Sequence, residues 1–142
     1  MENQNELAEI ESIFLALADK TRLRLLSLMR DGEVCVNLFS ETLMLSQPKV
    51  SRHLAYLRNA GVVSPRRHGK WIYYQINPAI SVGGTRVLNE TFDWLATLDV
   101  VRIDYERFDR LRLRGLEVQT EMDEIISQPV YERNQEIETF LL

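Results

Sequence analysis

The sequence has few cysteines, no long apolar run and no secretory leader, and each of these argues against one class of protein. It has one cysteine, Cys35, so no disulfide bond can form within the chain. No uninterrupted apolar run approaches the roughly 20 residues that a membrane-spanning helix requires. No positively charged and then apolar leader opens the chain, which argues against secretion. We therefore expect a soluble, cytoplasmic protein, and its 142 residues provide for one ordinary hydrophobic core rather than two.

Acidic residues are absent from a central part of the chain, although the protein as a whole is acidic. All 21 Asp and Glu residues lie outside residues 42–89, and the chain has a formal net charge of −4. Seven cations lie within this acid-free stretch: Lys49, Arg52, Arg58, Arg66, Arg67, Lys70 and Arg86. A basic block inside an acidic protein is typical of a surface that binds a polyanion. A solvated basic face is the simpler alternative.

Hydrophobic spacing and capping residues predict a run of helices in the first part of the chain. These helices cover residues 7–17, 20–32 and 33–45, with Asp19 as the cap of the second. Ser46 can cap a fourth helix that ends near Gly61, and Pro48 fits its first turn because amide groups there lack intrahelical partners. In this fourth helix Val50, Leu54 and Leu57 form one apolar stripe, and the opposite side is polar.

After Gly61 the hydrophobic period changes from that of a helix to that of a strand. Residues 62–67 and 71–76 are rich in β-branched and aromatic side chains, and the turn-prone segment His68-Gly69-Lys70 separates them. This pattern predicts a β-hairpin whose tip is basic. A short helix, a capped helix with a polar outer face and a basic hairpin form a winged helix-turn-helix, so we expect a mainly α fold with a β-hairpin wing.

The predicted fourth helix and hairpin carry the candidate DNA contacts. The major groove of B-DNA admits one α-helix, whose exposed donors and acceptors read the base edges. Base contacts are expected from Gln47, Ser51, Arg52 and His53. Contacts to the DNA backbone are expected from Ser46, Lys49, Arg66, Arg67, His68 and Lys70. Two alternatives stay open: His53 as a helix-flank residue that supports the wing, and His68 as an idle, solvent-exposed residue.

The segment from Ala16 to Ile76 resembles the ArsR/SmtB (arsenic-repressor) family of bacterial winged-helix regulators. The resemblance is carried by "ALADKTRLRLL", "EVCVN", "LSQPKVSRHLAYLRNAG" and "RRHGKWIYYQI", which occur in this order. It implies a homodimer that binds a pseudo-palindromic, double-stranded DNA operator and usually represses transcription until an inducer releases it. In that family the first helix and the helix after the wing build the dimer interface.

Two apolar stripes match those interface helices. On the first helix they are Leu7, Ile10 and Phe14, and after the wing they are Leu88, Phe92 and Leu95, within a helix expected from Thr85 to about Leu98. The alternative is that these stripes only close the core of a monomer. Helix-turn-helix proteins that read palindromic DNA are commonly dimers, which favours the interface.

The inducer is where the chain departs from the arsenic-sensing pattern. Arsenic-sensing members carry a Cys-x-Cys pair and a further Cys at the start of the third helix, whereas Asn37 and Ser40 stand at the second and third of these positions here. Cys35 alone is the candidate for sensing an inducer, and its alternative is a small buried hydrophobe. No metal site is expected, because residues 85–142 contain no His and the two histidines lack ligand spacing. No cofactor is predicted, and a metalloid or metal inducer stays open.

Two other classes of function compete with DNA-binding regulation. Catalysis is not expected, because a pairing of Cys35 with either histidine would lack an orienting partner. A winged-helix module that docks proteins without binding DNA is the main alternative. The predicted organisation is a DNA-binding and dimerisation domain over residues 1–98 and a helical extension over 99–142, with one helix ending at Gly115 and another ending before Pro129.

Overall fold

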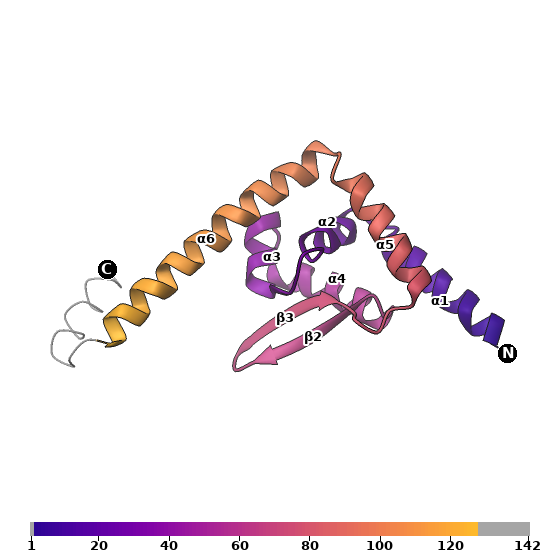
Figure 1. The fold of residues 1–142 in the computed structure, drawn as a ribbon, viewed down its shortest axis with the longest axis horizontal. Coiled ribbons are helices and arrows are strands. Elements are labelled where there is room, and N and C mark those ends of the chain that lie inside the picture. The colour runs from indigo at the N-terminus through magenta and orange to yellow at the C-terminus, as the bar shows by residue number, and fades with distance from the viewer. Residues whose placement is uncertain (1, 128–142) are drawn as a thin grey trace. The chain divides into compact units, whose positions relative to one another are not determined.

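The computed structural model describes residues 2–127, which belong to two compact units with their boundary after Phe108. The elements run in the order shown in Figure 1. The helices are α1 (Glu2–Leu17), α2 (Lys20–Leu28), α3 (Val36–Leu43), α4 (Gln47–Asn59), α5 (Val82–Leu95) and α6 (Asp99–Ser127). The strands are β1 (Val34–Cys35), β2 (Val63–His68) and β3 (Trp71–Ile76). The predicted mainly α fold with a hairpin wing is confirmed.

Capping side chains set where α2 and α4 begin, as the sequence predicts. The Asp19 carboxylate accepts a hydrogen bond from the Arg22 amide (2.9 Å), and the Ser46 hydroxyl accepts one from the Lys49 amide (3.4 Å). Pro48 lies in the first turn of α4, where its missing N–H leaves no intrahelical bond unmade. The start of α4 is therefore determined by two neighbouring residues.

The apolar stripe of α4 anchors that helix in the core of the first unit. Val50, Leu54 and Leu57 are fully buried and join a cluster that includes Leu25 of α2 and Phe39 of α3. Burying one such side chain contributes roughly 1.5 to 3 kcal/mol. Because three consecutive turns of α4 are anchored in this way, the opposite side of the helix is held toward solvent.

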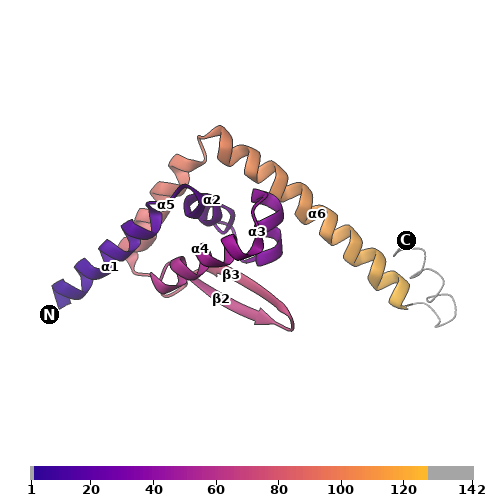
Figure 2. The ribbon, with the colours of Figure 1, turned by 180° about the vertical axis from the view of Figure 1, so that it is seen from behind.

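The wing is part of a three-stranded antiparallel sheet in the order β1-β3-β2. β2 and β3 pair from Val63 with Ile76 to His68 with Trp71, and Gly69 takes a positive φ of 59° in the turn. Figure 2 shows the hairpin from behind, projecting next to α3 and α4. The basic tip is connected to α4 through these paired strands, of which β2 packs against α4.

Strand β1 corrects the predicted third helix, which was expected to begin at Glu33. Val34 pairs with Tyr74 and Cys35 with Tyr73, so these two residues extend the wing sheet instead of starting a helix. The strand covers the edge of β3 that β2 leaves open, and β-branched Val34 suits a strand. α3 begins at Val36, directly after the strand, and Cys35 is its N-cap residue.

The last two helices also differ from the prediction. α5 begins at Val82 rather than Thr85, because the Ser81 hydroxyl accepts a hydrogen bond from the Gly84 amide (3.0 Å). α6 continues from Asp99 through Gly115 to Ser127, so the two predicted helices are one and the expected stop at Gly115 is wrong. A glycine inside a helix costs only about 1 kcal/mol, which the strong helix formers around Gly115 outweigh.

Each unit has its own contacts. Within residues 109–127, short pairs along the helix face include Arg112 with Asp109 (3.2 Å) and Gln119 with Asp123 (2.8 Å).

The rest of the predicted extension, residues 128–142, lies outside the described residues, and the predicted functional boundary at residue 98 stays a prediction. No helix within residues 2–127 has the length and apolar character needed to cross a membrane.

Candidate nucleic-acid interface

The solvent-exposed face of α4 presents polar side chains and no acid. Gln47, Lys49, Ser51 and Arg52 are all exposed, and the buried stripe lies on the other side of the helix. Among the described residues, no carboxylate forms an ion pair with Lys49 or Arg52. Both cations therefore stay available to an external anion. The predicted separation of a buried and a presented side of α4 is confirmed.

The wing carries cations of two kinds. Arg67, His68 and Lys70 are exposed near the turn, and the Lys70 ammonium lies 5.3 Å from the centre of the Trp71 ring. Arg66, in contrast, donates hydrogen bonds of 3.0 and 2.5 Å to the two carboxylate oxygens of Glu33. Arg67, His68 and Lys70 thus match the predicted exposed tip, whereas Arg66 already has an anionic partner.

The Arg66 pair was not visible in the sequence pattern, because it depends on the sheet. The Arg66 guanidinium also stacks over Tyr73 at 4.8 Å, and Glu33 directly precedes β1. Hydrogen bonding to Arg66 lowers the pKa of the Glu33 carboxyl below its ordinary value. Glu33 lies outside the acid-free stretch in the sequence. When β1 pairs with β3, the Glu33 carboxylate comes close to the basic wing. A signal for this contact exists only when the pairing of β1 is known.

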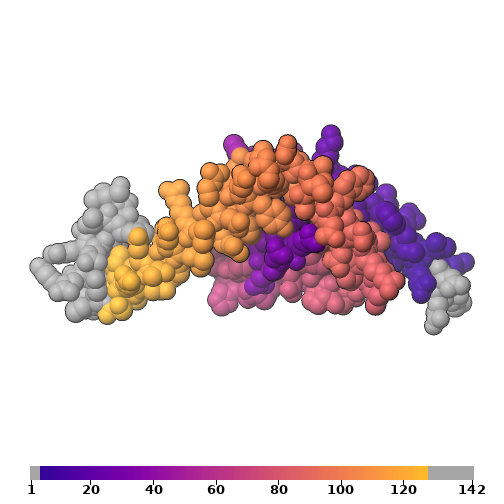
Figure 3. All heavy atoms as spheres, turned by 45° about the horizontal axis from the view of Figure 1, so that its top comes forward, coloured from indigo at the N-terminus to yellow at the C-terminus, as the bar shows by residue number. Residues whose placement is uncertain are grey.

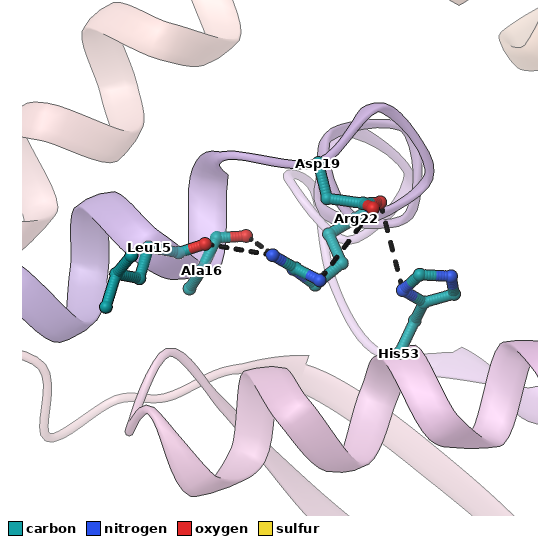
Figure 4. Close-up of polar contacts among 5 residues, drawn as sticks. All are labelled: Leu15, Ala16, Asp19, Arg22 and His53. Atoms are coloured by element: carbon teal, nitrogen blue, oxygen red, sulfur yellow. Dashed lines mark hydrogen bonds and ion pairs between the residues drawn. The ribbon is translucent and has the colours of Figure 1, made fainter.

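His53 lies on the flank of α4 rather than on its exposed face. Its side chain is 19% exposed, and Nδ1 is 3.8 Å from a carboxylate oxygen of Asp19 (Figure 4). Burial is the main cause that lowers the pKa of His53, with the Asp19 charge opposing it. The structure therefore separates His53 from the other three predicted base contacts. Its neighbour is the start of α2, not the wing that the alternative interpretation named.

Gln47 and Ser51 lie on the opposite flank, beside Cys35. Gln47 donates a hydrogen bond to the Asn37 side chain (2.6 Å) and so ties α4 to α3. A cavity of about 400 Å³ lies between α3, α4 and the wing. It is lined by Cys35, Val36, Asn37, Gln47, Ser51, Lys70, Trp71, Ile72 and Tyr74. The half-buried Cys35 thiol thus shares a cavity with two predicted base contacts.

The two positions that hold further thiols in arsenic-sensing members have structural hydrogen bonds here. Asn37 accepts the Gln47 bond, and the Ser40 hydroxyl donates to the Leu45 carbonyl (2.5 Å), which closes the end of α3. Within residues 2–127, no group of three or more His, Cys, Asp or Glu side chains is arranged to hold a metal ion. Cys35 is the one thiol that the chain can offer to a soft ligand at this place.

The predicted interface residues fall into two groups. Leu7, Ile10 and Phe14 on α1 are 65%, 49% and 55% exposed, which leaves their apolar side chains without a cover in a single chain. Leu88 and Phe92 are only 1% and 5% exposed, because α5 packs them into the core of the chain itself. These two residues are therefore corrected from interface to core.

The groove between α1 and α5 is partly apolar. Ile10, Ile13 and Phe14 line it from α1 and Val87 from α5, in a cavity of about 430 Å³. In Figure 3, α1 (indigo) and α5 lie beside one another on the face that is shown. The helices approach closely because Gly84 has no side chain: a Cβ there would lie 3.0 Å from Ile13 Cδ1. Exposed Val82 and Trp94 on α5 were not among the predicted interface residues.

The sequence matches a family model and several known proteins. Residues 19–64 match the model described as "Bacterial regulatory protein, arsR family". The arsenic resistance transcriptional regulator ArsR1 of Pseudomonas putida is 51% identical over 69 residues, which is 48% of this chain and 54% of that relative. The arsenical resistance operon repressor of Escherichia coli is 41% identical over 81 residues, covering 56% of this chain and 69% of the relative.

A solved structure supports the same assignment. The homodimeric winged helix-turn-helix DNA-binding domain of Mb0332 from Mycobacterium bovis, described as a possible ArsR-family regulator, aligns with a TM-score of 0.54 and 26% identity. The alignment covers 61% of this chain and 78% of that domain. The capped α4, the wing and these matches agree, and the chain belongs to the arsR family of bacterial winged helix-turn-helix transcriptional regulators.

Proposed function

We propose that this protein is a cytoplasmic, homodimeric repressor that inserts α4 into the major groove of its operator. One observation carries the proposal: α4 presents a polar face without acids, on which Lys49 and Arg52 have no carboxylate partner among residues 2–127, while its other side is anchored in the core. The P. putida and E. coli relatives are named as an arsenic resistance regulator and an operon repressor, which supports repression of transcription.

The residues of the interface take two roles in this proposal. Gln47, Ser51 and Arg52 contact base edges, with Arg52 as the candidate for a bidentate contact to guanine. Contacts to phosphates come from Ser46, Lys49, Arg67, His68 and Lys70, all of which are exposed. Arg66 joins them only when it leaves Glu33. The positive charge on both α4 and the wing fits two adjacent stretches of DNA backbone.

The dimer contact is proposed for the exposed face of α1 and its neighbours on α5. Leu7, Ile10 and Phe14 are large apolar side chains in solvent, and half-buried Leu95 with exposed Trp94 continues this character on α5. A second copy of the chain would cover them, as a symmetric dimer requires a self-complementary surface. The homodimeric state of the Mb0332 domain supports this arrangement. Two copies of α4 then match a palindromic operator.

Cys35 is the proposed point at which an inducer acts. It lies in the cavity that also contains Gln47 and Ser51, so a ligand bound to the thiol would contact the DNA-reading face of α4. A site with three thiolates is excluded at this position, since Asn37 and Ser40 replace the other two. If Cys35→Ser leaves release from DNA unchanged for every inducer that acts on the wild type, Cys35 has no sensing role.

The proposed function is tested by fluorescence anisotropy with purified protein. A duplex from the upstream region of the protein's own gene is compared with a scrambled duplex at several salt concentrations. We expect tighter binding to the native duplex and a linear fall of log affinity with log salt, because phosphate contacts release counterions. Absence of binding to either duplex at low salt would overturn the proposal and favour a protein-docking wing.

A further inference from the structure

Four side chains meet where α1 ends, α2 begins and α4 passes, and we call them the junction cluster: Asp19, Arg22, His53 and Tyr56. Arg22 holds the end of α1, since its Nε donates to the Ala16 carbonyl (2.8 Å) and its Nη2 to the Leu15 carbonyl (2.9 Å) (Figure 4). The last carbonyls of a helix lack i+4 amide donors, and Arg22 supplies a donor to the Ala16 carbonyl and a second one to the Leu15 carbonyl, which also accepts from the Ala18 amide (3.2 Å). The Arg22 side chain is only 12% exposed.

Asp19 holds the start of α2 from the same place. Its carboxylate accepts the Arg22 amide hydrogen bond, and the Arg22 guanidinium lies 3.9 Å from its other oxygen. The backbone hydrogen bond from Arg22 is the main cause that lowers the pKa of Asp19. The end of α1 and the beginning of α2 are thus connected through two charged side chains, which restrict the angle between these helices.

The same two side chains contact α4 at points three residues apart. Asp19 approaches His53, and the Arg22 guanidinium stacks on Tyr56 at 4.1 Å from the ring centre. His53 and Tyr56 are neighbours on one flank of the helix because residues at i and i+3 share a face. Contacts at two levels of one flank restrict rotation of α4 about its own axis. Arg52 directly precedes His53, so such a rotation would move this predicted base contact.

We propose that the junction cluster sets the orientation of the recognition helix α4 relative to α1, and that His53 and Tyr56 are positioning residues rather than DNA contacts. This inference rests on the proposed function, in which α1 forms the dimer contact and α4 reads the operator. In such a dimer the α1 face and α4 together determine where the second recognition helix lies. Half-sites one helical turn apart, about 34 Å, tolerate little error in that placement. By fixing the orientation of α4, the junction cluster therefore raises the affinity for the operator relative to the affinity for other DNA.

The test is a double-mutant cycle of Asp19→Asn and His53→Gln, measured on an operator duplex and a scrambled duplex. Asparagine retains the N-cap of α2 and removes the charge that faces His53, so α2 stays capped. We expect each single variant to weaken operator binding by about threefold to tenfold, with the double variant no weaker than the weaker single variant. Binding to the scrambled duplex should stay within about twofold, since no phosphate contact is removed.

Other outcomes of this cycle overturn the proposal. If His53→Gln weakens operator binding while Asp19→Asn does not, His53 contacts DNA directly. Equal losses on both duplexes, or losses that multiply in the double variant, exclude a shared positioning role. Tyr56→Phe is the matched control, because it retains the ring under Arg22 and should bind like the wild type, whereas Tyr56→Ala should behave like His53→Gln.

A pH series gives a readout that simple loss of packing would not produce. Around His53 stand Asp19, which favours protonation, and Arg22, Lys49 and Arg52, which with burial oppose it and lower the pKa. Because its pKa lies below the ordinary value of 6.5, His53 is neutral at pH 7.5, and protonation at lower pH adds a further cation beside Arg22, Lys49 and Arg52. We expect the ratio of operator to scrambled affinity to fall for the wild type as the pH is lowered from 7.5 into the range below 6.5, and to stay constant for His53→Gln. A parallel fall in His53→Gln, which retains His68, would contradict this role.

Unfolding measurements separate failure of this inference from failure of the proposed function. The same four proteins are unfolded in urea without DNA, where coupled side chains give non-additive changes. If the wild type binds no duplex, the proposed function fails, but non-additive unfolding of Asp19→Asn and His53→Gln would still support the cluster. Additive unfolding changes would overturn the cluster whether or not the protein binds DNA.

Discussion

The arginines of α4 and the wing differ from those that join α2, α3 and α6 in whether a group of the protein already binds them. On α4 and the wing, Arg52 and Arg67 are exposed, and no carboxylate among the described residues pairs with either one. On α2, Arg24 donates hydrogen bonds of 2.7 and 2.8 Å to both oxygens of Asp104, a residue that is 2% exposed. Nearby, Arg107 donates to the Thr42 carbonyl (2.8 Å) at the end of α3.

This contrast shows how one residue type serves stability in one region and binding in another. A buried bidentate pair holds the first turns of α6 against α2, and a lone partner in such a pair would be an uncompensated charge. An exposed arginine without a carboxylate adds little to stability, but its charge stays available to phosphate. Arg66 with its partner Glu33 is the exception, since it lies on the wing but is paired.

The largest expected effect concerns the buried pair. Asp104→Ala removes the carboxylate and leaves the Arg24 guanidinium, 28% exposed, without its anionic partner. We expect the free energy of unfolding to fall by about 3 kcal/mol. The measurement is urea unfolding followed by circular dichroism.

The matched control for this variant is Asp99→Ala. Asp99 also pairs with an arginine, Arg102, but its side chain is 88% exposed and the pair lies on the surface of α6. A fall of no more than about 1 kcal/mol is expected there, because exposed pairs add little to stability and an acid in the first turn of a helix contributes a similarly small amount. If Asp104→Ala and Asp99→Ala lowered the free energy of unfolding equally, buried and exposed arginine pairs would not differ in their contribution to stability.

Arg52→Ala tests the unpaired side of the comparison. We expect operator affinity to fall by about 1 to 3 kcal/mol with relaxed base preference, because a bidentate base contact is lost. Unfolding should be unchanged, since no carboxylate within residues 2–127 pairs with Arg52. Arg86→Ala, an exposed cation of α5 outside the predicted site, is the control in the same anisotropy assay. Equal losses on operator and scrambled duplexes would contradict base reading by Arg52.

Lys49→Ala should act through phosphate alone. We expect a similar loss of affinity on operator and scrambled DNA, and a slope of log affinity against log salt that is shallower by about one. The salt series of the anisotropy assay measures this directly. A loss confined to the operator, with an unchanged slope, would move Lys49 from the phosphate contacts to the base contacts.

The smallest effect is expected from Glu33→Gln, which releases the paired cation of the wing. Arg66 then becomes available to DNA, so affinity for both duplexes should rise modestly and the salt slope should steepen by up to about one. Glu33→Gln with Arg66→Ala in the same chain is the control, because the gain should vanish without the arginine. Weaker binding of Glu33→Gln would show that the pair shapes the wing for DNA.

Much of the fold was predictable because its signals are local. The start of α4 depends on Ser46 and Pro48, and its orientation depends on an apolar stripe that repeats within the same helix. The hairpin follows from a change of period and a glycine turn. The exposed position of Arg52 follows from the stripe, because residues on the opposite side of an anchored helix face solvent, whereas Gln47 and Ser51 lie on a flank of the helix.

The parts that were not predictable depend on distant partners. Val34 and Cys35 become a strand only because β3 offers them an open edge. Leu88 and Phe92 have the same spacing as interface residues, and only the packing of α5 shows that they belong to the core. The predicted helix end at Gly115 was wrong for a different reason. The strong helix formers around Gly115 outweigh the cost of one glycine, and both facts are visible in the sequence.

The amino-acid sequence by itself determined the winged helix-turn-helix, the family and the acid-free stretch of residues 42–89, since caps, periodicity and composition act over a few neighbouring residues. Only the tertiary structure decided which charges are free. Glu33 meets Arg66 across 33 residues and Arg24 meets Asp104 across 80, and His53 turns to Asp19 rather than to the exposed face. Such pairs form when folded helices and strands bring side chains together, and no local pattern specifies which distant partner will be near.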